Sequence, residues 1–213
     1  MRTRRHPWRT PIAERRCSAQ GARAADFTEI ERVRRISKLT ALPFVARAVV
    51  DALREFPRLN AAVDGDTLIV HRSVNIGIAV DLDHQGLVVP VVRGADGMRL
   101  RDLATAFRDL AARARAKQLG PDDVSGGTFT ITNPGAAGTW ISFPILNSPQ
   151  VGILATDGVA KRVVADEHDG LRIAPVANLC LTFDHRAVDG AYAGAFLARL
   201  REIVERRDWA AEL

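Results

Sequence analysis

The chain has 213 residues, of which 47% are apolar and 26% charged, a composition typical of a folded domain with a hydrophobic core. No run approaches the roughly eighteen apolar residues of a membrane-spanning helix, so we expect no membrane association. The net charge of +5 is concentrated at the start, where residues 1–35 carry ten arginines against four acidic residues. No nucleic-acid-binding motif accompanies these arginines, and we therefore expect no nucleic-acid partner.

The two cysteines, Cys17 and Cys180, fit neither a metal-ligand spacing nor a disulfide framework. This usage favours a reducing compartment, the cytoplasm, or the mitochondrial matrix if the protein is eukaryotic. An arginine-rich, acid-poor start is also typical of a targeting peptide, and that alternative stays open. Cys180 lies in an apolar run and is interpreted as a small buried residue.

The pattern of apolar residues predicts helices and short strands in alternation. A helix is predicted over residues 40–56, and it ends before Pro57. A second helix is predicted over residues 99–119, with its arginines and aspartates in solvent and Gly120 at its C-terminal cap. A third helix closes the chain and carries Phe196, Leu197, Leu200, Ile203 and Val204.

Strands are predicted at residues 67–71, 75–82, 87–93, 127–132, 151–155, 159–164 and 173–183. Residues 84–86 are predicted to connect two of them as a hairpin. This order predicts an α/β domain of the two-layer α+β kind, in which helices pack on a large mixed β-sheet.

His185 differs from the other histidines because it follows the apolar run 179–183 and precedes Asp189, Gly190 and a helix. A strand end that opens into a loop is a common position for catalytic groups. Taken alone, His185 and Asp189 fit a metal pair, a hydrolase fragment or a structural pair. The chain offers no third and fourth metal ligand beside them and no Gly-x-Ser-x-Gly elbow, so we expect no metal and no serine nucleophile. We therefore expect His185 to act as a base on the nucleophile of a substrate.

Residues 184–190 read Asp-His-Arg-Ala-Val-Asp-Gly and resemble the Asp-His-Arg-x-x-Asp-Gly motif of the acyltransferase (E2) components of 2-oxo acid dehydrogenase complexes. Two further segments are similar to that family: Gly-Thr-Phe-Thr-Ile-Thr-Asn-Pro-Gly at 127–135 and Pro-Ile-Leu-Asn-Ser-Pro-Gln at 144–150. The shorter His-x-x-x-Asp pattern is shared with chloramphenicol acetyltransferase. The resemblance extends from residue 40 to the C-terminus and implies the CoA-dependent acyltransferase (chloramphenicol acetyltransferase-like) fold.

The resemblance implies transfer of an acyl group between dihydrolipoamide and coenzyme A, which is a substrate. A thiol with a pKa of about 8.5 is mostly protonated at neutral pH, and His185 would be the general base that removes its proton. Thr132 matches the family's hydroxyl residue that donates a hydrogen bond to the oxyanion. Asp189 matches an aspartate that supports the active-site loop through an ion pair with an N-terminal arginine, here Arg15, with Arg16 as the alternative. Gly190 is interpreted as a backbone requirement at the helix start.

The resemblance further implies a homotrimer whose active site lies between subunits, with assembly into a larger cubic core as a further step. Residues 1–35 are predicted to form a basic N-terminal arm that is shorter than the family's, and residues 36–213 the acyltransferase catalytic domain. No lipoyl domain and no peripheral subunit-binding domain is recognised, so we expect the lipoyl group on another chain, with a lipoyl-bearing protein and other dehydrogenase-complex components as partners. Two alternatives stay open: an acyl-CoA-dependent acyltransferase for a small alcohol or amine, and a non-catalytic scaffold protein of the same fold.

Overall fold

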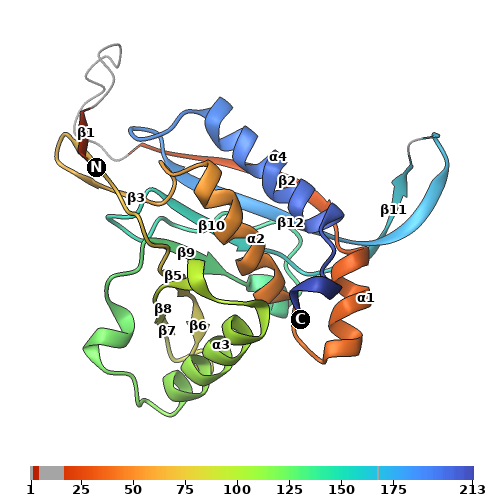
Figure 1. Cartoon of the computed structure of the whole chain (residues 1–213), viewed down its shortest axis with the longest axis horizontal. Helices are drawn as coiled ribbons and strands as arrows, with labels where there is room; N and C mark the ends of the chain where they lie inside the picture. The colour runs from red at the N-terminus through yellow and green to blue at the C-terminus, as the bar shows by residue number, and fades with distance from the viewer. Residues whose placement is uncertain (1, 5–16, 167) are drawn as a thin grey trace.

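The computed structural model describes residues 2–4, 17–166 and 168–213 (Figure 1). A seven-stranded sheet lies at its centre, with the strand order β11-β12-β10-β9-β5-β8 and with β2 as a further partner of β12. The pairs β5–β9 and β9–β10 are parallel and the other pairs are antiparallel, so the sheet is mixed, as predicted. Its strands are β2 (Ser18–Asp26), β5 (Ile76–Ile78), β8 (Val91–Val92), β9 (Phe129–Thr132), β10 (Gly152–Thr156), β11 (Ala160–Ala165) and β12 (Leu171–Asp184).

Two smaller sheets flank the central one. A three-stranded sheet contains β1 (Arg2–Arg4), β4 (Thr67–Val70) and β3 (Ala61–Asp64), in that order. The strands β6 (Val80–Asp81) and β7 (Leu87–Val88) form a hairpin around the turn that the sequence predicts.

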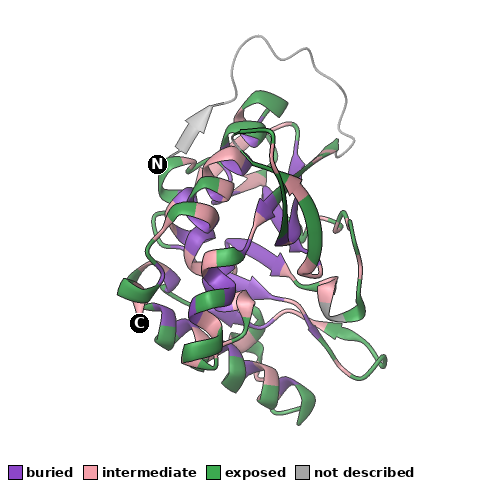
Figure 2. Ribbon diagram, turned by 90° about the vertical axis from the view of Figure 1, so that its right-hand side faces the viewer, coloured by how far each residue is buried: buried purple, intermediate pink, exposed green. Residues whose placement is uncertain are grey.

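The α-helices gather on one face of the central sheet (Figure 2). They are α1 (Thr28–Ser37), α2 (Ala41–Glu55), α3 (Leu100–Arg115) and α4 (Gly190–Arg206), and short 3-10 turns occur at Ala95–Gly97, Pro121–Val124, Pro134–Ala137 and Ala210–Glu212. Nine of the fifteen residues of α2 are buried, so most of the surface of this helix packs in the core. Helix α4 lies along β2 and β12, and helix α2 contacts both α3 and α4.

The alternation of side chains along β12 separates the two faces of the sheet. Leu179, Leu181 and Phe183 belong to the hydrophobic core under the helices. Because successive side chains of a strand point to opposite faces, Thr182 and Asp184 lie on the other face, which no α-helix of the described residues covers. This helix-free face carries the features of interest for function.

Most predicted elements are present, and four strands or helices of the structure were missed. The predicted helices correspond to α2, α3 and α4, and the predicted strands to β4–β12. Strands β1, β2 and β3 and helix α1 were not predicted. The predicted domain boundary at residue 35 falls inside α1 (Thr28–Ser37), and β2 (Ser18–Asp26), assigned to the arm, pairs with β12 along nine residues.

The predicted end of the second helix is wrong. Helix α3 ends at Arg115, and Lys117 adopts a left-handed conformation with a φ of 56°. The Gln118 N–H then donates to the Arg113 carbonyl at 2.8 Å, which closes the helix before Gly120. Asp123 stabilises this early turn, because its carboxylate pairs with Arg113 and accepts the Gly120 N–H at 2.8 Å.

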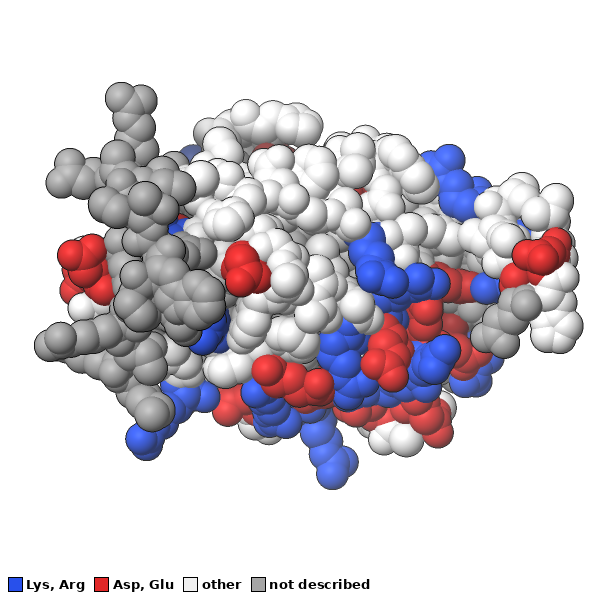
Figure 3. All heavy atoms as spheres, turned by 90° about the horizontal axis from the view of Figure 1, so that it is seen from above, with Lys and Arg blue, Asp and Glu red and all other residues white. Residues whose placement is uncertain are grey.

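Charged side chains lie mainly away from the core, as the pattern of α3 predicts. Arg101, Asp102, Arg108 and Asp109 are all exposed on that helix. Figure 3 shows basic and acidic side chains intermixed along one side of the molecule, beside a broad area without charged residues. The intermixing of both signs in this view favours a solvated surface over a single-sign binding patch.

Trp209 offers a test of the core. Its side chain is fully buried, its ring meets the Phe44 ring edge-on at 5.5 Å, and its indole N–H donates to the Val204 carbonyl at 3.1 Å. Trp209→Ala removes this packing and is expected to lower the free energy of unfolding by about 3–5 kcal/mol. Urea unfolding followed by circular dichroism measures the change. Ile36→Ala is the control, because Ile36 is 74% exposed, and a loss of similar size there would contradict the assignment of Trp209 to the core.

Candidate active site

The Asp-His-Arg segment forms a tight turn directly after β12. The Asp184 carboxylate, on a residue only 6% exposed, accepts hydrogen bonds from the Arg186 backbone N–H at 2.9 Å and from the Arg186 guanidinium at 2.5–3.0 Å. The Ala187 and Val188 N–H groups donate to the Asp184 carbonyl, which completes the turn. The ion pair raises the pKa of Arg186 above its ordinary value, so the guanidinium stays charged. This fork fixes the backbone on both sides of His185.

His185 is exposed at the apex of this turn. Its backbone N–H donates to the Cys17 carbonyl at 2.8 Å, which joins the turn to the start of β2, and its ring lies 5.8 Å from the Phe183 ring. Within residues 2–4, 17–166 and 168–213, no hydrogen bond involves the imidazole nitrogens. The turn thus presents an imidazole whose nitrogens are open to a substrate.

Thr132 ends β9 and belongs to the helix-free face. Phe129 and Ile131 face the helices, so Thr130 and Thr132 point to the opposite face. The Thr130 hydroxyl donates to the side-chain oxygen of Gln150 at 2.7 Å, which ties the Pro-Gln segment to the sheet. The Thr132 hydroxyl makes no hydrogen bond among the described residues, so it too is open to a substrate.

Strand register shows that one chain does not bring His185 and Thr132 together. Thr132 is level with Ala155, and Ala155 is level with Cys180, whereas His185 lies five residues beyond Cys180. Five residues of strand and two strand spacings put the two residues on the order of 20 Å apart. A hydrogen-bonded site that contains both side chains therefore needs a second chain.

Asp189 caps helix α4. Its carboxylate accepts the Tyr192 N–H at 2.9 Å, which satisfies one of the free donors at the helix start. Its predicted partner Arg15, and the alternative Arg16, lie outside the described residues. The interpretation of Gly190 as a backbone requirement is wrong, because the space where a Cβ atom would lie is open and its φ is outside the left-handed region.

A buried carboxylate near the Thr132 end of the sheet was not anticipated from the sequence. Asp157 is 2% exposed and accepts hydrogen bonds from the Thr139 hydroxyl at 2.9 Å and from the Ser142 N–H and hydroxyl. The Cys180 thiol donates to the same carboxylate at 3.3 Å, and burial raises the pKa of this thiol to about 11. Asp157 therefore holds the loop after Thr132 against the sheet, and Cys180 is the unreactive thiol that its apolar context predicts.

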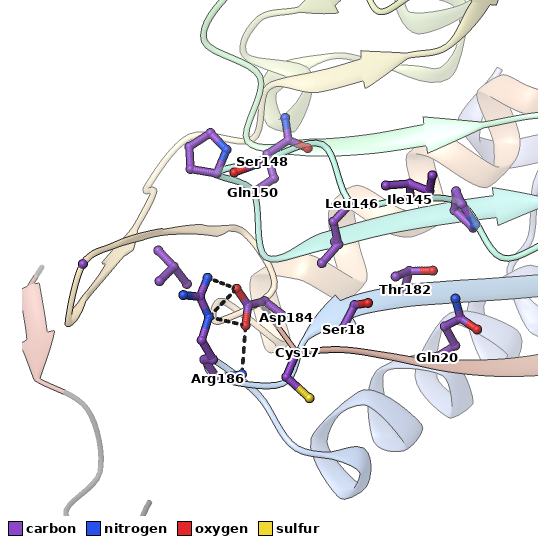
Figure 4. A pocket seen from close by; sticks show the side chains of 14 residues that line it. Cys17, Ser18, Gln20, Ile145, Leu146, Ser148, Gln150, Thr182, Asp184 and Arg186 are labelled. Atoms are coloured by element: carbon purple, nitrogen blue, oxygen red, sulfur yellow. Dashed lines mark hydrogen bonds and ion pairs between the residues drawn. The ribbon is translucent and has the colours of Figure 1, made fainter. Parts of the chain in front are cut away.

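A cavity of about 430 Å³ lies on the helix-free face next to Asp184 and Arg186 (Figure 4). Ser18 and Gln20 of β2 and Thr182 of β12 form one side of it, and the segment from Pro144 to Leu146 forms another. Asp184, Arg186 and Cys17 line the end next to the His185 turn. This cavity was not predictable from sequence patterns, because it depends on the register of β2 against β12.

Among residues 2–4, 17–166 and 168–213, no three His, Cys, Asp or Glu side chains are grouped as metal ligands would be. No helix in the same ranges is both long and apolar enough to cross a membrane.

Comparison with known families gives a match over most of the chain. The sequence model described as 2-oxoacid dehydrogenases acyltransferase (catalytic domain) matches residues 20–210. The chain is 43% identical over 195 residues to the dihydrolipoyllysine-residue acetyltransferase component of the pyruvate dehydrogenase complex of Mycobacterium bovis, covering 89% of this chain and 34% of that protein. It is 44% identical over 168 residues to the succinyltransferase component of the 2-oxoglutarate dehydrogenase complex of Bacillus subtilis, covering 79% of this chain and 40% of that protein. The chain thus spans about a third to two fifths of the length of these relatives.

Solved structures agree with these matches. The cubic core of a pyruvate dehydrogenase multienzyme complex superposes with a TM-score of 0.86 at 34% identity, covering 90% of this chain and 82% of that one. The dihydrolipoamide acetyltransferase of Azotobacter vinelandii, studied for the roles of a serine, a histidine and an asparagine in its catalysis, gives the same TM-score and coverage at 33% identity. Chloramphenicol acetyltransferase has a TM-score of 0.60 at 11% identity and covers 88% of each chain, a likeness of fold alone.

The Asp184–Arg186 pair predicts a measurable contribution to stability. Arg186→Ala leaves a buried carboxylate without its cation, and the free energy of unfolding is expected to fall by about 2 kcal/mol. Urea unfolding at pH 7 measures this loss. Arg199→Ala is the control, because Arg199 pairs with Glu55 on the surface and solvent screens that ion pair. Equal losses in the two variants would contradict a special role for the turn.

Proposed function

The chain belongs to the 2-oxoacid dehydrogenase acyltransferase family, and from this premise we propose that it transfers an acyl group between dihydrolipoamide and coenzyme A. The observation that carries the proposal is the Asp184–Arg186 fork, which presents the His185 imidazole with both nitrogens open among the described residues. Names among the relatives include both acetyl- and succinyltransferases, so the acyl group is a question for experiment.

The residues suit a transfer between two thiols. His185 removes the proton from the attacking thiol, and the thiolate adds to the thioester carbonyl. The negative charge that develops on the carbonyl oxygen is met by the Thr132 hydroxyl as a hydrogen-bond donor. The tetrahedral intermediate then releases the second thiolate, which takes the proton back from the His185 imidazolium. The reaction leaves the protein unchanged and needs no metal.

The relative from Azotobacter vinelandii supports these roles by spacing. Its asparagine follows its histidine by four residues, as Asp189 follows His185 here, and its serine precedes the histidine by nearly the interval that separates Thr132 from His185. The side-chain oxygens of asparagine and aspartate both accept hydrogen bonds. Either residue type at the Asp189 position can therefore cap α4. We therefore assign Asp189 to support of the loop, with Arg15 as its proposed ion-pair partner.

The separation of His185 and Thr132 within one chain supports an active site between subunits. We propose a homotrimer, in which His185 of one subunit faces Thr132 of its neighbour, and the similarity to a cubic core favours trimers as units of a larger assembly. The exposed apolar residues Trp140, Ile141, Phe143 and Ile145, next to the cavity-lining segment, suit burial between subunits.

The remaining parts of the proposal concern organisation and partners. We propose that the catalytic domain includes residues 36–213, and that the lipoyl group reaches the site on another, lipoyl-bearing protein of a dehydrogenase complex. The bacterial sources of the relatives support the cytoplasm as the compartment.

Turnover tests the proposed roles. The protein, given acetyl-, succinyl- or branched-chain acyl-CoA with free dihydrolipoamide, is expected to form S-acyl-dihydrolipoamide, detected by mass spectrometry. His185→Ala is expected to lower kcat by about 10²–10⁴-fold, because the general base is lost. Thr132→Val is expected to lower kcat by about 10²–10³-fold, whereas Thr132→Ser keeps the hydroxyl and most of the activity. Absence of turnover with all three acyl groups would favour the scaffold alternative.

Subunit mixing tests the location of the site. The variants His185→Ala and Thr132→Val, each almost inactive alone, are unfolded together, refolded as a mixture and assayed. In randomly mixed trimers, about a quarter of the intersubunit sites combine an intact histidine with an intact threonine, so about a quarter of the wild-type activity should return. Variants refolded separately and then assayed together without exchange are the control. No recovery in mixtures that are shown to contain both subunits would contradict the intersubunit site.

A further inference from the structure

Asp157 is a buried carboxylate just beyond β10, and four neutral donors bind it. It is 2% exposed, and among the described residues no lysine or arginine forms an ion pair with it. Its Oδ1 atom accepts the hydroxyls of Thr139, at 2.9 Å, and Ser142. Its Oδ2 atom accepts the Ser142 N–H at 3.2 Å and the Cys180 thiol at 3.3 Å. A buried charge is costly unless such donors satisfy it, so these contacts hold their partners in place.

The loop after Thr132, residues 133–143, is attached to Asp157 along its backbone as well. A Cβ atom on Gly135 would lie 2.4 Å from the Asp157 carbonyl carbon, so only a residue without a side chain fits there. The N–H of the same peptide group donates to the Thr139 carbonyl at 3.0 Å. The loop therefore meets Asp157 three residues after Thr132 and again seven residues after it.

The second half of the loop is fixed through β11 and β12. The Asn178 side-chain amide donates to the Trp140 carbonyl at 2.7 Å, and the Asn178 carbonyl accepts the Asp157 N–H at 3.1 Å. The Arg162 guanidinium lies 3.6 Å from the centre of the Trp140 ring, a cation–π contact on a ring that is 45% exposed. Two buried polar side chains, Asp157 and Asn178, thus hold the loop over the helix-free face.

We propose that Asp157 is a positioning residue for acyl transfer, and that it acts through Thr132 by fixing the 133–143 loop. The inference rests on the proposed function, in which the Thr132 hydroxyl donates to the oxyanion. Such a donor lowers the barrier only when it is held where the charge develops, and a misplacement of about 1 Å costs up to about 10²-fold in rate. Thr132 is the last residue of β9, so the sheet holds it on one side and the loop holds it on the other.

The arrangement of the four donors implies that hydrogen bonding, and not the negative charge, positions the loop. An asparagine at this site places its oxygen at the Oδ2 position, where the Ser142 N–H and the Cys180 thiol donate. Its amide N–H groups then face the two hydroxyls, which rotate to accept. Asp157→Asn should therefore keep the loop in place. Asp157→Leu has a similar size but no acceptor, and it leaves the same donors unpaired until the loop opens to water.

Kinetics of the full chain with acyl-CoA and dihydrolipoamide test the route through Thr132. Asp157→Leu is expected to lower kcat roughly tenfold, with KM for acyl-CoA within about twofold of the wild type, whereas Asp157→Asn keeps most of the activity. In the double variant Thr132→Val/Asp157→Leu, kcat should equal that of Thr132→Val alone, because the hydroxyl that Asp157 positions is already gone. A further tenfold loss in the double variant would overturn the proposal, since a general structural defect lowers kcat in both backgrounds.

Alkylation of Cys180 follows the loop without any turnover. This thiol is fully buried beside Asp157 and Ser142, and burial raises its pKa to about 11, so it should react very slowly with iodoacetamide in the wild type. In Asp157→Leu the loop opens, and alkylation is expected to become at least roughly tenfold faster, whereas Asp157→Asn should stay much closer to the wild type. Peptide mapping measures both cysteines, and the exposed Cys17 is the internal reference.

Urea unfolding establishes that the variants are folded. If Asp157→Leu does not fold, Ser142→Ala removes one of the hydrogen bonds from the loop side and is expected to lower kcat roughly threefold; an unchanged kcat there would overturn the proposal. Absence of turnover in the wild type would overturn the proposed function. An unchanged alkylation rate of Cys180 in folded Asp157→Leu would overturn the role of Asp157, with or without turnover, so the two failures are read separately.

Discussion

Backbone pairing of β12 is the interaction on which the rest of the structure depends. This strand of 14 residues pairs with β2, β10 and β11. Without it, β10 would become an edge strand beside β9, and β2 and β11 would lose their one partner strand among the described residues. Its alternating side chains separate the helix-packed core from the helix-free face. The Asp184 N–H still bonds to the Val151 carbonyl at 2.9 Å, and the chain leaves the sheet immediately afterwards. The His185 turn is therefore anchored to the most extensively paired strand of the molecule.

The helix-free face differs in chemistry from the face under the helices. Gly77 has space for no side chain, because a Cβ atom there would lie 2.8 Å from Val89 and 3.1 Å from the Thr130 hydroxyl. Threonine hydroxyls and small residues take the positions that leucine and phenylalanine take on the core face. The buried carboxylate on this side, Asp157, is satisfied by hydroxyl, thiol and N–H donors rather than by a cation. Such a face suits contact with neutral, hydrogen-bonding groups.

Helical periodicity made α2, α3 and α4 predictable, because each buries one apolar side. Strand β2 was not predictable from its own residues, since Ser18–Asp26 contains four alanines and no β-branched or aromatic residue that would favour a strand. Its conformation is imposed by pairing with β12, a contact between distant parts of the chain. The early end of α3 depends in the same way on Asp123, which sequence patterns did not connect with Arg113.

The candidate site was predictable in its residues but not in its geometry. The motif at 184–190 and the threonine at 132 were identified from the sequence, because their chemistry and spacing resemble a family. The distance between them depends on the register of β9, β10 and β12, and no local pattern encodes that register. The Asp184–Arg186 fork also depends on the turn, because the turn after β12 brings the Arg186 guanidinium back to the Asp184 carboxylate.

Three polar side chains near the candidate site lack a hydrogen-bond partner among the described residues. In the described chain the His185 imidazole and the Thr132 hydroxyl make no hydrogen bond, and the buried Thr182 hydroxyl has no partner. A fold selected for stability alone would satisfy such a buried group or replace it with valine at little steric cost. Because the surrounding sheet is otherwise well paired, the unsatisfied groups are better explained by partners that bind than by loose packing. The strand register keeps Thr132 and His185 of one chain apart, so a single chain holds only part of a site that contains both side chains.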